Sequence, residues 1–219
     1  MLKREAMARV LPFAIYMGFI LVADVLSRLG VTDVQLRWLY AVKIGAVVAA
    51  LLFYRREYRE LASRLSPRAA LVAVAAGVLV LVLWINLDLP WMRVGASAGF
   101  DPRTDGVVDW SLVAVRLLGA ALVVPLMEEL FWRSFLLRWV QSPDFLNVTP
   151  AQVKVGAFVV TVILFGIEHN LWLAGMVAGL VYNLLYIRSS TLWSPILAHA
   201  VTNGLLGLWI IQTANWTYW

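Results

Sequence analysis

Seven long apolar runs divide this chain, and they constrain its fold more than any other feature. A helix that crosses a bilayer needs about 20 apolar residues, and a segment facing lipid must pair its own backbone groups. An eighth, shorter run at 130–140 is interrupted by two arginines. We therefore predict an all-α, polytopic integral membrane helical bundle with seven to eight transmembrane helices. The seven runs cover residues 10–26, 38–54, 69–87, 112–127, 153–167, 171–187 and 192–211.

The composition excludes several other classes of protein. Of the 219 residues, 62% are hydrophobic and 14% charged, and the mean hydropathy is +0.81. A soluble domain carries charge on about a quarter of its residues. The lack of cysteine rules out a disulfide framework, a thiolate metal site and a cysteine nucleophile. The arginines lie at the edges of apolar runs rather than in one patch, so we expect no nucleic-acid partner.

The charges of two loops predict the orientation of the chain. Loop 55–68 holds five arginines and two glutamates, whereas loop 88–109 holds four aspartates and two arginines. Because basic loops stay in the cytoplasm, this asymmetry places the amino terminus and loop 55–68 there and the acidic loop outside.

Polar residues inside the later runs need an explanation, because an ionisable group near the bilayer centre costs at least a few kcal/mol. Lys43 and Asp24 lie near the ends of their runs, where a charged head can reach the interface, and we interpret both as structural. The other polar groups include both histidines of the chain. Their joint presence favours a functional site, since each has its own desolvation cost. They are Glu128, Glu129, Arg133, His169, His199 and Asn203.

The spacing of these residues separates a paired carboxylate from a free one. Glu129 and Arg133 are four residues apart on one helix face, so they can form an ion pair, which by itself is explained equally well as structural. Glu128 is rotated by about 100° from its neighbour and stays free for chemistry. His199 and Asn203, also four apart, give one face with two hydrogen-bonding groups. Adjacent carboxylates in a low dielectric suit a general base.

Three short strings stand in order on successive apolar segments. They are Glu128-Glu129-Leu130-Phe131-Trp132-Arg133, Phe165-Gly166-Ile167-Glu168-His169 and His199-Ala200-Val201-Thr202-Asn203. Each is weak alone, but the ordered set resembles the motifs of the CAAX-protease and bacteriocin-processing family, intramembrane endopeptidases that include the type II CAAX prenyl proteases. The resemblance covers about residues 110–212. Ser134 departs from it, because many members have glycine after the arginine.

The resemblance implies a hydrolytic mechanism. Glu128 with His169 would hold and deprotonate a water that attacks a peptide carbonyl. His199 and Asn203 would donate hydrogen bonds to the oxyanion that forms.

The resemblance leaves the need for a metal open. Glu129 and Arg133 would position the reacting glutamate or a substrate terminus. A zinc-dependent enzyme would combine His169, His199 and Glu128 as ligands. Because the chain has no His-Glu-x-x-His string and His199 is well placed to act with Asn203 as a donor, we favour a glutamate-type enzyme with no metal and no cofactor.

The resemblance also implies how the chain is organised and where it acts. We expect one transmembrane domain over residues 1–219, with the first three spans and the acidic loop in 1–109 and the catalytic core in 110–212. The substrate would be a membrane-associated or lipidated protein or peptide, met in the lipid bilayer. The compact length favours a prokaryotic member in the inner membrane. The sequence leaves the substrate's identity and the oligomeric state open.

Two other functions and one decoy motif remain. A proton-coupled carrier also places glutamate and histidine in its spans, although the two halves of this chain show no similarity. A non-catalytic scaffold or immunity protein would keep the motifs and bind a partner. The string Gly95-Ala96-Ser97-Ala98-Gly99 matches the Gly-x-Ser-x-Gly nucleophile pattern but lacks its strand-to-helix context, so we interpret it as a decoy.

The depth of the site is the remaining question. A span that begins at Trp110 carries Glu128 about 27 Å along the helix, whereas His169 falls at the outer end of its own run. The two can meet if the helix enters the membrane near Arg116 and continues to Val140. Residues 168–170 would then form a break inside the membrane, lining a polar cavity.

Overall fold

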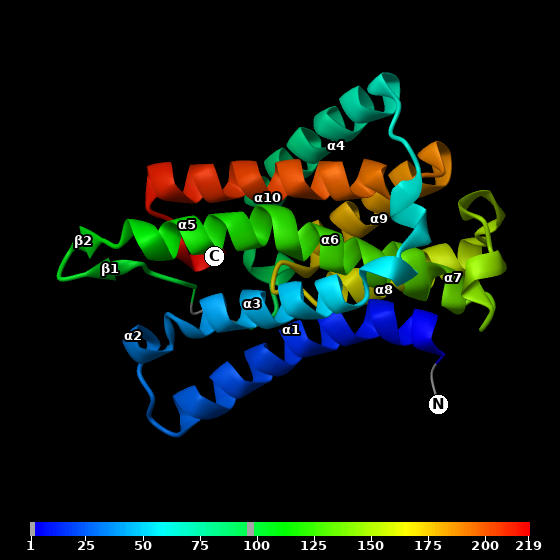
Figure 1. Ribbon diagram of the computed structural model, residues 1–219. Coiled ribbons are helices and arrows are strands. Elements are labelled where there is room, and N and C mark those ends of the chain that lie inside the picture. The colour runs from blue at the N-terminus through cyan, green and yellow to red at the C-terminus, as the bar shows by residue number, and fades with distance from the viewer. Residues whose placement is uncertain (1–2, 96–98) are drawn as a thin grey trace.

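The computed structural model describes residues 3–95 and 99–219, which form a bundle of long helices (Figure 1). A short antiparallel hairpin, β1 (Arg103–Thr104) and β2 (Val107–Val108), projects at one end and pairs Arg103 with Val108. Apart from this hairpin, the regular elements of the described chain are helices, which confirms the all-α prediction. The main helices are α1 (Arg4–Arg28), α3 (Leu39–Phe53), α4 (Pro67–Asn86), α8 (Val155–Ile167), α9 (Trp172–Ser189), α10 (Trp193–Thr213) and a long rod over Trp110–Trp139; a short α2 (Asp33–Leu36) precedes α3.

Five helical segments of the described chain are long and apolar enough to cross a membrane. This number is smaller than the seven to eight predicted spans. The run at 130–140 continues the rod rather than forming a span of its own, and α8 has only 13 residues. Helix α9 covers the run at 171–187 but also contains polar residues, among them Asn183 and Arg188. The five segments are Arg4–Arg28, Asp33–Phe53, Pro67–Asn86, Trp110–Trp139 and Trp193–Thr213.

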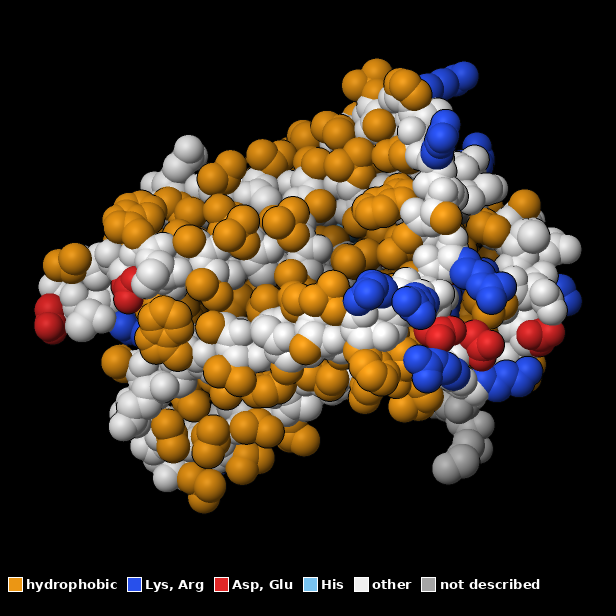
Figure 2. Space-filling model, viewed as in Figure 1, with side chains coloured by type: hydrophobic (Ala, Val, Ile, Leu, Met, Phe, Trp, Pro, Cys, Tyr) orange, Lys and Arg blue, Asp and Glu red, His pale blue; other side chains and the backbone are white. Residues whose placement is uncertain are grey.

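Large apolar side chains cover the outside of the bundle, as Figure 2 shows in orange. Leu21, Leu71 and Val155 are exposed on 63%, 72% and 79% of their surface. Soluble monomers rarely expose large contiguous apolar patches. These side chains fit a bundle whose outer face contacts lipid, which agrees with an integral membrane protein.

The rod is one continuous helix with two wider π-helical segments. It consists of α5 (Trp110–Leu118), η4 (Gly119–Val123), α6 (Val124–Glu129), η5 (Leu130–Leu136) and α7 (Leu137–Trp139). Asp109 caps its first turn by accepting hydrogen bonds from two backbone N–H groups, those of Ser111 at 2.9 Å and Leu112 at 3.3 Å. Single π-helical turns are frequent at functional sites.

Pro125 explains how α10 is fastened to the rod. In η4 the N–H of Val124 donates to the carbonyl of Gly119, five residues earlier. The next donor in this pattern would be residue 125, but proline has no N–H. The carbonyl of Ala120 instead accepts a hydrogen bond of 2.9 Å from Nδ2 of Asn203 on α10. A side chain thus replaces the missing backbone donor.

A buried polar network attaches α1 to the rest of the bundle. Arg9 has no exposed surface and donates to both carboxylate oxygens of Glu60, at 2.9 and 2.6 Å, and to Oγ of Ser134 at 2.9 Å. The hydroxyl of Ser134 also contacts Glu60 and accepts a bond of 2.8 Å from Arg138. The serine that departs from the family pattern is therefore the point at which the first helix and loop 55–68 are joined to the rod.

Candidate active site

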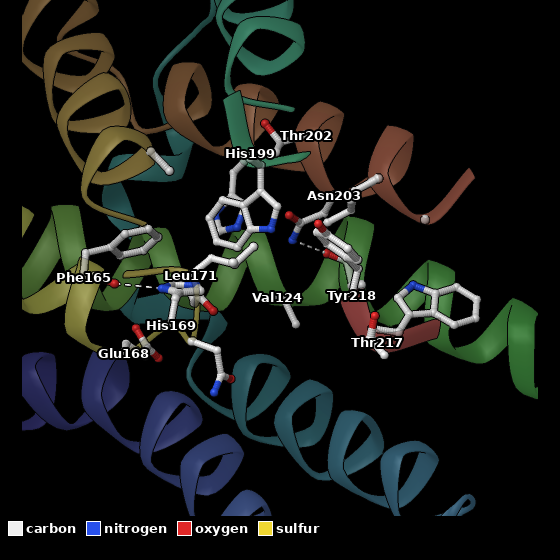
Figure 3. Close-up of a pocket in the computed structure, with 18 of the residues that line it drawn as sticks. Val124, Phe165, Glu168, His169, Leu171, His199, Thr202, Asn203, Thr217 and Tyr218 are labelled. Atoms are coloured by element: carbon white, nitrogen blue, oxygen red, sulfur yellow. Dashed lines mark hydrogen bonds between the residues drawn. The ribbon is translucent and has the colours of Figure 1, made fainter. Parts of the chain in front are cut away.

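The predicted catalytic residues lie around one cavity of about 550 Å³. Glu128 comes from the rod, His169 from the turn between α8 and α9, and His199 and Asn203 from α10. Figure 3 shows both histidines and the asparagine at this cavity. Three segments that are far apart in sequence therefore bring the four side chains together.

The two neighbouring glutamates have different surroundings, as the spacing predicts. Glu128 lines the cavity, and its Oε2 has no hydrogen-bond partner within the described chain. Glu129 is fully buried, and its Oε1 accepts a hydrogen bond of 3.1 Å from Nη1 of Arg133. The same oxygen lies 2.9 Å from Nδ1 of His199. The pair of Glu129 and Arg133 therefore contacts His199, a partner that the sequence analysis did not predict.

Arg133 is held from several directions. It donates to Oδ1 of Asn183 at 3.1 Å and to the carbonyl of Gly179 at 3.3 Å, both on α9. Its guanidinium also lies 4.4 Å from the ring centre of Phe165. These contacts fix the guanidinium behind the cavity, so it acts on the site through Glu129.

His169 has one ring nitrogen engaged and one available. Its Nδ1 lies 2.7 Å from the carbonyl oxygen of Phe165, drawn as a dashed line in Figure 3. A carbonyl only accepts, so this contact assigns the proton to Nδ1 and leaves Nε2 as the acceptor in the neutral ring. Trp84 packs edge-on against the imidazole, with ring centres 5.2 Å apart. The ring is thus oriented by its neighbours.

His199 packs against a tyrosine that is itself held by a short chain of hydrogen bonds. Its ring stacks on Tyr182, with centres 5.0 Å apart. The hydroxyl of Tyr182 donates to Thr202 at 2.8 Å, and Thr202 donates to the carbonyl of Gly77 at 2.9 Å. Gly77 allows this close approach of α4 to α10, because a Cβ there would lie 2.4 Å from the carbonyl of Ala198.

Asn203 uses one of its amide hydrogens for the bond to Ala120, which leaves the second hydrogen and Oδ1. The side chain of Asn203 therefore joins α10 to the rod and still has polar atoms available at the cavity.

Several other residues of the cavity have no predicted role from the sequence. Glu168 lines the cavity and accepts a hydrogen bond of 3.1 Å from Nε1 of Trp132. An ionisable side chain inside a membrane span is costly and therefore a candidate functional residue, and this argument applies to Glu168 as well as to Glu128. Tyr16, Tyr40 and Arg116 also line the cavity. Their approach depends on how the first helices pack, which no local pattern reveals.

The residues that could hold zinc do not form a cluster in this arrangement. Within the described parts of the chain, no three side chains of His, Cys, Asp or Glu lie together as metal ligands. Nδ1 of His199 faces Glu129, and Nδ1 of His169 faces a carbonyl. Both Nε2 atoms lie outside these contacts, so a zinc-dependent enzyme would use them, with Glu128, as its ligands.

The lengths of the helices account for the depth of the site. Helix α8 is about 20 Å long at 1.5 Å per residue, which is shorter than the roughly 30 Å hydrocarbon core. The turn after it, which holds Glu168 and His169, can therefore lie within the membrane. The rod has 30 residues, enough to place Glu128 at the same level.

Of the Gly-x-Ser-x-Gly match at 95–99, residues 96–98 lie outside the described residues.

Comparison with known families gives one match, in the second half of the chain. A family model described as type II CAAX prenyl endopeptidase Rce1-like matches residues 110–205, which include all three motifs. The resemblance to CAAX proteases is thereby confirmed for this segment. The family implies intramembrane protease activity of the CAAX type, on membrane-associated substrates, in an integral membrane protein. Neither the search of curated proteins nor that of solved structures found a match.

Proposed function

We propose that this chain is an intramembrane endopeptidase in which Glu128 and His169 activate a water molecule and His199 and Asn203 stabilise the oxyanion. The observation that carries the proposal is the convergence of these four side chains on one cavity among membrane-spanning helices. The substrate class is a membrane-associated or lipidated protein or peptide.

The two acid–base groups have complementary properties. The unpartnered Oε2 of Glu128 and Nε2 of His169 are both free to accept a proton from water. Water held between them would attack the peptide carbonyl as its proton passes to Glu128. The protonated glutamate then gives that proton to the leaving amine.

The other pair faces the charge that develops during the attack. In this role Nε2 of His199, with both ring nitrogens protonated, and the second amide hydrogen of Asn203 would donate to the oxyanion. Glu129 stabilises the imidazolium at Nδ1, as a carboxylate does in a serine-protease triad. One such preorganised donor is typically worth about 2.7–4 kcal/mol of transition-state free energy.

A glutamate-type reaction without metal is the version we propose. Zinc held by His169, His199 and Glu128 would bind the two Nε2 atoms, because both Nδ1 atoms are already engaged. The metal-free version assigns those Nε2 atoms to the water and the oxyanion instead. Loss of activity on chelation, restored by stoichiometric zinc, would contradict the metal-free proposal.

We further propose that the amino terminus and loop 55–68 face the cytoplasm of a prokaryotic cell. The basic cluster of that loop lies at one end of the bundle in Figure 2, and the acidic residues of the hairpin lie at the other. Reporter fusions to residues 60 and 105 that give the opposite pattern would reject this orientation.

The function is tested by comparing membrane-proteome termini in cells that carry the wild-type chain or Glu128→Gln. New termini that disappear in the variant would support proteolysis and identify the substrate. Glu57→Gln is the matched control, because Glu57 pairs with the exposed Arg4 and does not line the cavity. Identical termini in all strains, with every protein expressed and folded, would favour a scaffold or a carrier.

A further inference from the structure

The exposed residues of the catalytic cavity gather in one place. Glu128 and His199 are each only 5% exposed. Asn170, which is exposed, is fixed to the loop after α4, because its carbonyl accepts a hydrogen bond of 2.8 Å from the N–H of Val94 and its Nδ2 donates to the carbonyl of Val94 at 2.9 Å. We call the exposed residues the mouth of the cavity. Among the described residues that line it, they are Arg93, Gly95, Asn170 and Thr217.

The mouth lies away from the basic loop 55–68. Helix α4 starts at the end of that loop, and its 20 residues carry the chain about 30 Å before residues 88–95 follow. Helix α10 also begins beside the loop, where Nε1 of Trp193 donates to the carbonyl of Leu61 at 2.9 Å. Residues 214–219 follow the far end of α10. Figure 1 shows loop 55–68 and the hairpin at opposite ends of the bundle, so the mouth is built by segments from the hairpin side.

Two contacts connect the mouth to the interface on that side. The N–H of Phe100, shortly before the hairpin, donates to the carbonyl of Trp216 at 3.0 Å. Trp91 is 61% exposed, and its carbonyl accepts a hydrogen bond of 3.2 Å from Nε1 of Trp172. Tryptophan is enriched where a membrane meets water. The mouth therefore has the composition of a membrane–water interface.

Aromatic side chains close the cavity toward the basic loop. Phe131 follows the two glutamates on the rod and stacks on Phe13 of α1, with ring centres 3.9 Å apart. Trp132 packs edge-on against Phe165 at 5.5 Å and is 5% exposed. Figure 3 shows Phe165 and Thr217 on opposite sides of the cavity. Beyond the aromatic layer lies the polar network of Ser134, and none of the residues of loop 55–68 lines the cavity.

We propose that the cavity opens to water at the outer face of the membrane, and that the enzyme cleaves peptide segments that emerge on this face from exported, membrane-anchored proteins. This inference rests on the proposed function and on the proposed cytoplasmic position of loop 55–68. A cavity of about 550 Å³ admits an extended segment rather than a folded domain. Such a segment would pass the mouth and follow Ala120 and Val124, which line the cavity on the same face of the rod as Glu128.

The opening is tested by thiol labelling, for which the cysteine-free chain is well suited. Leu206→Cys places a thiol on the cavity wall. Leu208→Cys is the matched control, because Leu208 lies on the same helix, does not line the cavity and is 49% exposed on the apolar outside. The probe is a sulfonated maleimide that does not cross membranes. It is added to sealed membrane vesicles, either right-side-out or inverted.

The expected result is one-sided labelling. Leu206→Cys should react at least about tenfold faster in right-side-out vesicles than in inverted ones, because the reactive thiolate forms only where water reaches the thiol. Leu208→Cys should react slowly in both, since lipid keeps its thiol protonated. Arg59→Cys, in loop 55–68, should react only in inverted vesicles, which checks the orientation in the same preparation.

Each other outcome overturns the inference. Faster reaction of Leu206→Cys in inverted vesicles would place the opening at the cytoplasmic face. Equal rates from both sides, or no reaction from either, would reject an outer opening as well. Labelling of Arg59→Cys from outside would reject the orientation on which the inference rests. If Leu206→Cys does not fold, Thr217→Cys at the mouth must show the same sidedness.

Hydrolysis separates this inference from the proposed function. The probe is an apolar hexapeptide coupled to dextran, which keeps it on one side of a sealed vesicle. We expect cleavage by right-side-out vesicles, none by inverted vesicles, and loss of cleavage in Glu128→Gln. Thiol labelling from outside without any cleavage would contradict the peptidase and leave the outer opening standing. Cleavage confined to inverted vesicles would support the peptidase and reject access from outside.

Discussion

Two arginine–glutamate pairs with a buried arginine lie in different parts of this molecule, and they differ in how many carboxylate oxygens accept hydrogen bonds. Arg9 and Glu60 join α1 to loop 55–68, and both oxygens of Glu60 accept hydrogen bonds. Arg133 and Glu129 lie behind the cavity, where Oε2 of Glu129 has no hydrogen-bond partner among the described residues. The first pair lies outside the segment that matches the family model, although it bonds to Ser134 within that segment.

This difference separates a structural role from a functional one. A buried charge that is fully hydrogen-bonded fixes a geometry and has little capacity left for a ligand. Glu128 and Glu129 each keep one buried oxygen without a hydrogen-bond partner among the described residues, which a purely structural site avoids. The pair at Arg9 should therefore affect stability and leave the chemistry intact, whereas the glutamates of the cavity should do the opposite.

The largest expected effect is on catalysis. Glu128→Gln should lower the rate of peptide hydrolysis by about 10³-fold, because general-base catalysis contributes typically 10²–10⁴. The unfolding temperature should stay the same or rise, since an unpartnered buried carboxyl is removed. Single-turnover rates in proteoliposomes and thermal unfolding in detergent measure the two quantities. A variant that loses stability and keeps its rate would break the comparison.

The second effect is on stability. Arg9→Met leaves the half-buried Glu60 without its cation, so unfolding should become easier, by at most about 3–5 kcal/mol, the value for a fully buried pair. The rate per folded molecule should not change. Equilibrium unfolding in mixed micelles gives the free energy, and the double variant Arg9→Met with Glu60→Met should recover part of the loss. No recovery would mean that packing around Arg9, rather than charge, holds α1 in place.

An intermediate effect is expected at Asn203, which belongs to both the fold and the site. Asn203→Ala leaves the carbonyl of Ala120 without a donor, at a cost of about 1–3 kcal/mol. Adding Pro125→Ala supplies the missing backbone N–H, so it should restore stability but not activity if Asn203 binds the oxyanion. Rescue of both by the second substitution would reduce Asn203 to a positioning residue.

The sequence predicts the helical fold and the residues of the candidate site. The contacts between distant helices depend on tertiary packing and could not be predicted. The spacing of Glu128, Glu129 and Arg133 predicted one free and one paired carboxylate, because helix geometry is local. The partner of Glu129 could not be predicted, since His199 is 70 residues away and reaches it only through helix packing. The continuous rod and the short α8 allow Glu128 and His169 to lie at one depth, which the apolar runs alone do not show.

Two further contacts show where local patterns stop. Proline at 125 removes a backbone donor whatever the fold, but only the structure shows that Asn203 replaces it. Ser134 was noticed as a departure from the family pattern, and its bonds to Arg9 and Glu60 give that departure a physical reason. Both residues couple a local irregularity to a distant helix.

The smallest expected effect is a pH dependence confined to the structural pair. Burial acts to raise the pKa of Glu60, but the hydrogen bonds and charge of Arg9, with Ser134, outweigh it and hold the pKa below its ordinary value of 4.5. Because the folded pKa is depressed, this stabilisation is complete above about pH 4.5 and is lost as the pH falls through the folded pKa.

The difference in unfolding temperature between the wild-type chain and Glu60→Gln should therefore be constant near neutral pH and shrink in acid. Asp101→Asn is the control, since Asp101 also has a pKa lowered by Arg103, but that ion pair is exposed and contributes little. A Glu60→Gln difference that stays constant down to acid pH would mean that the network at Ser134 depends on shape rather than on charge. The charge of Glu60 would then contribute no stability, and the contrast between the two ion pairs would rest on their positions alone.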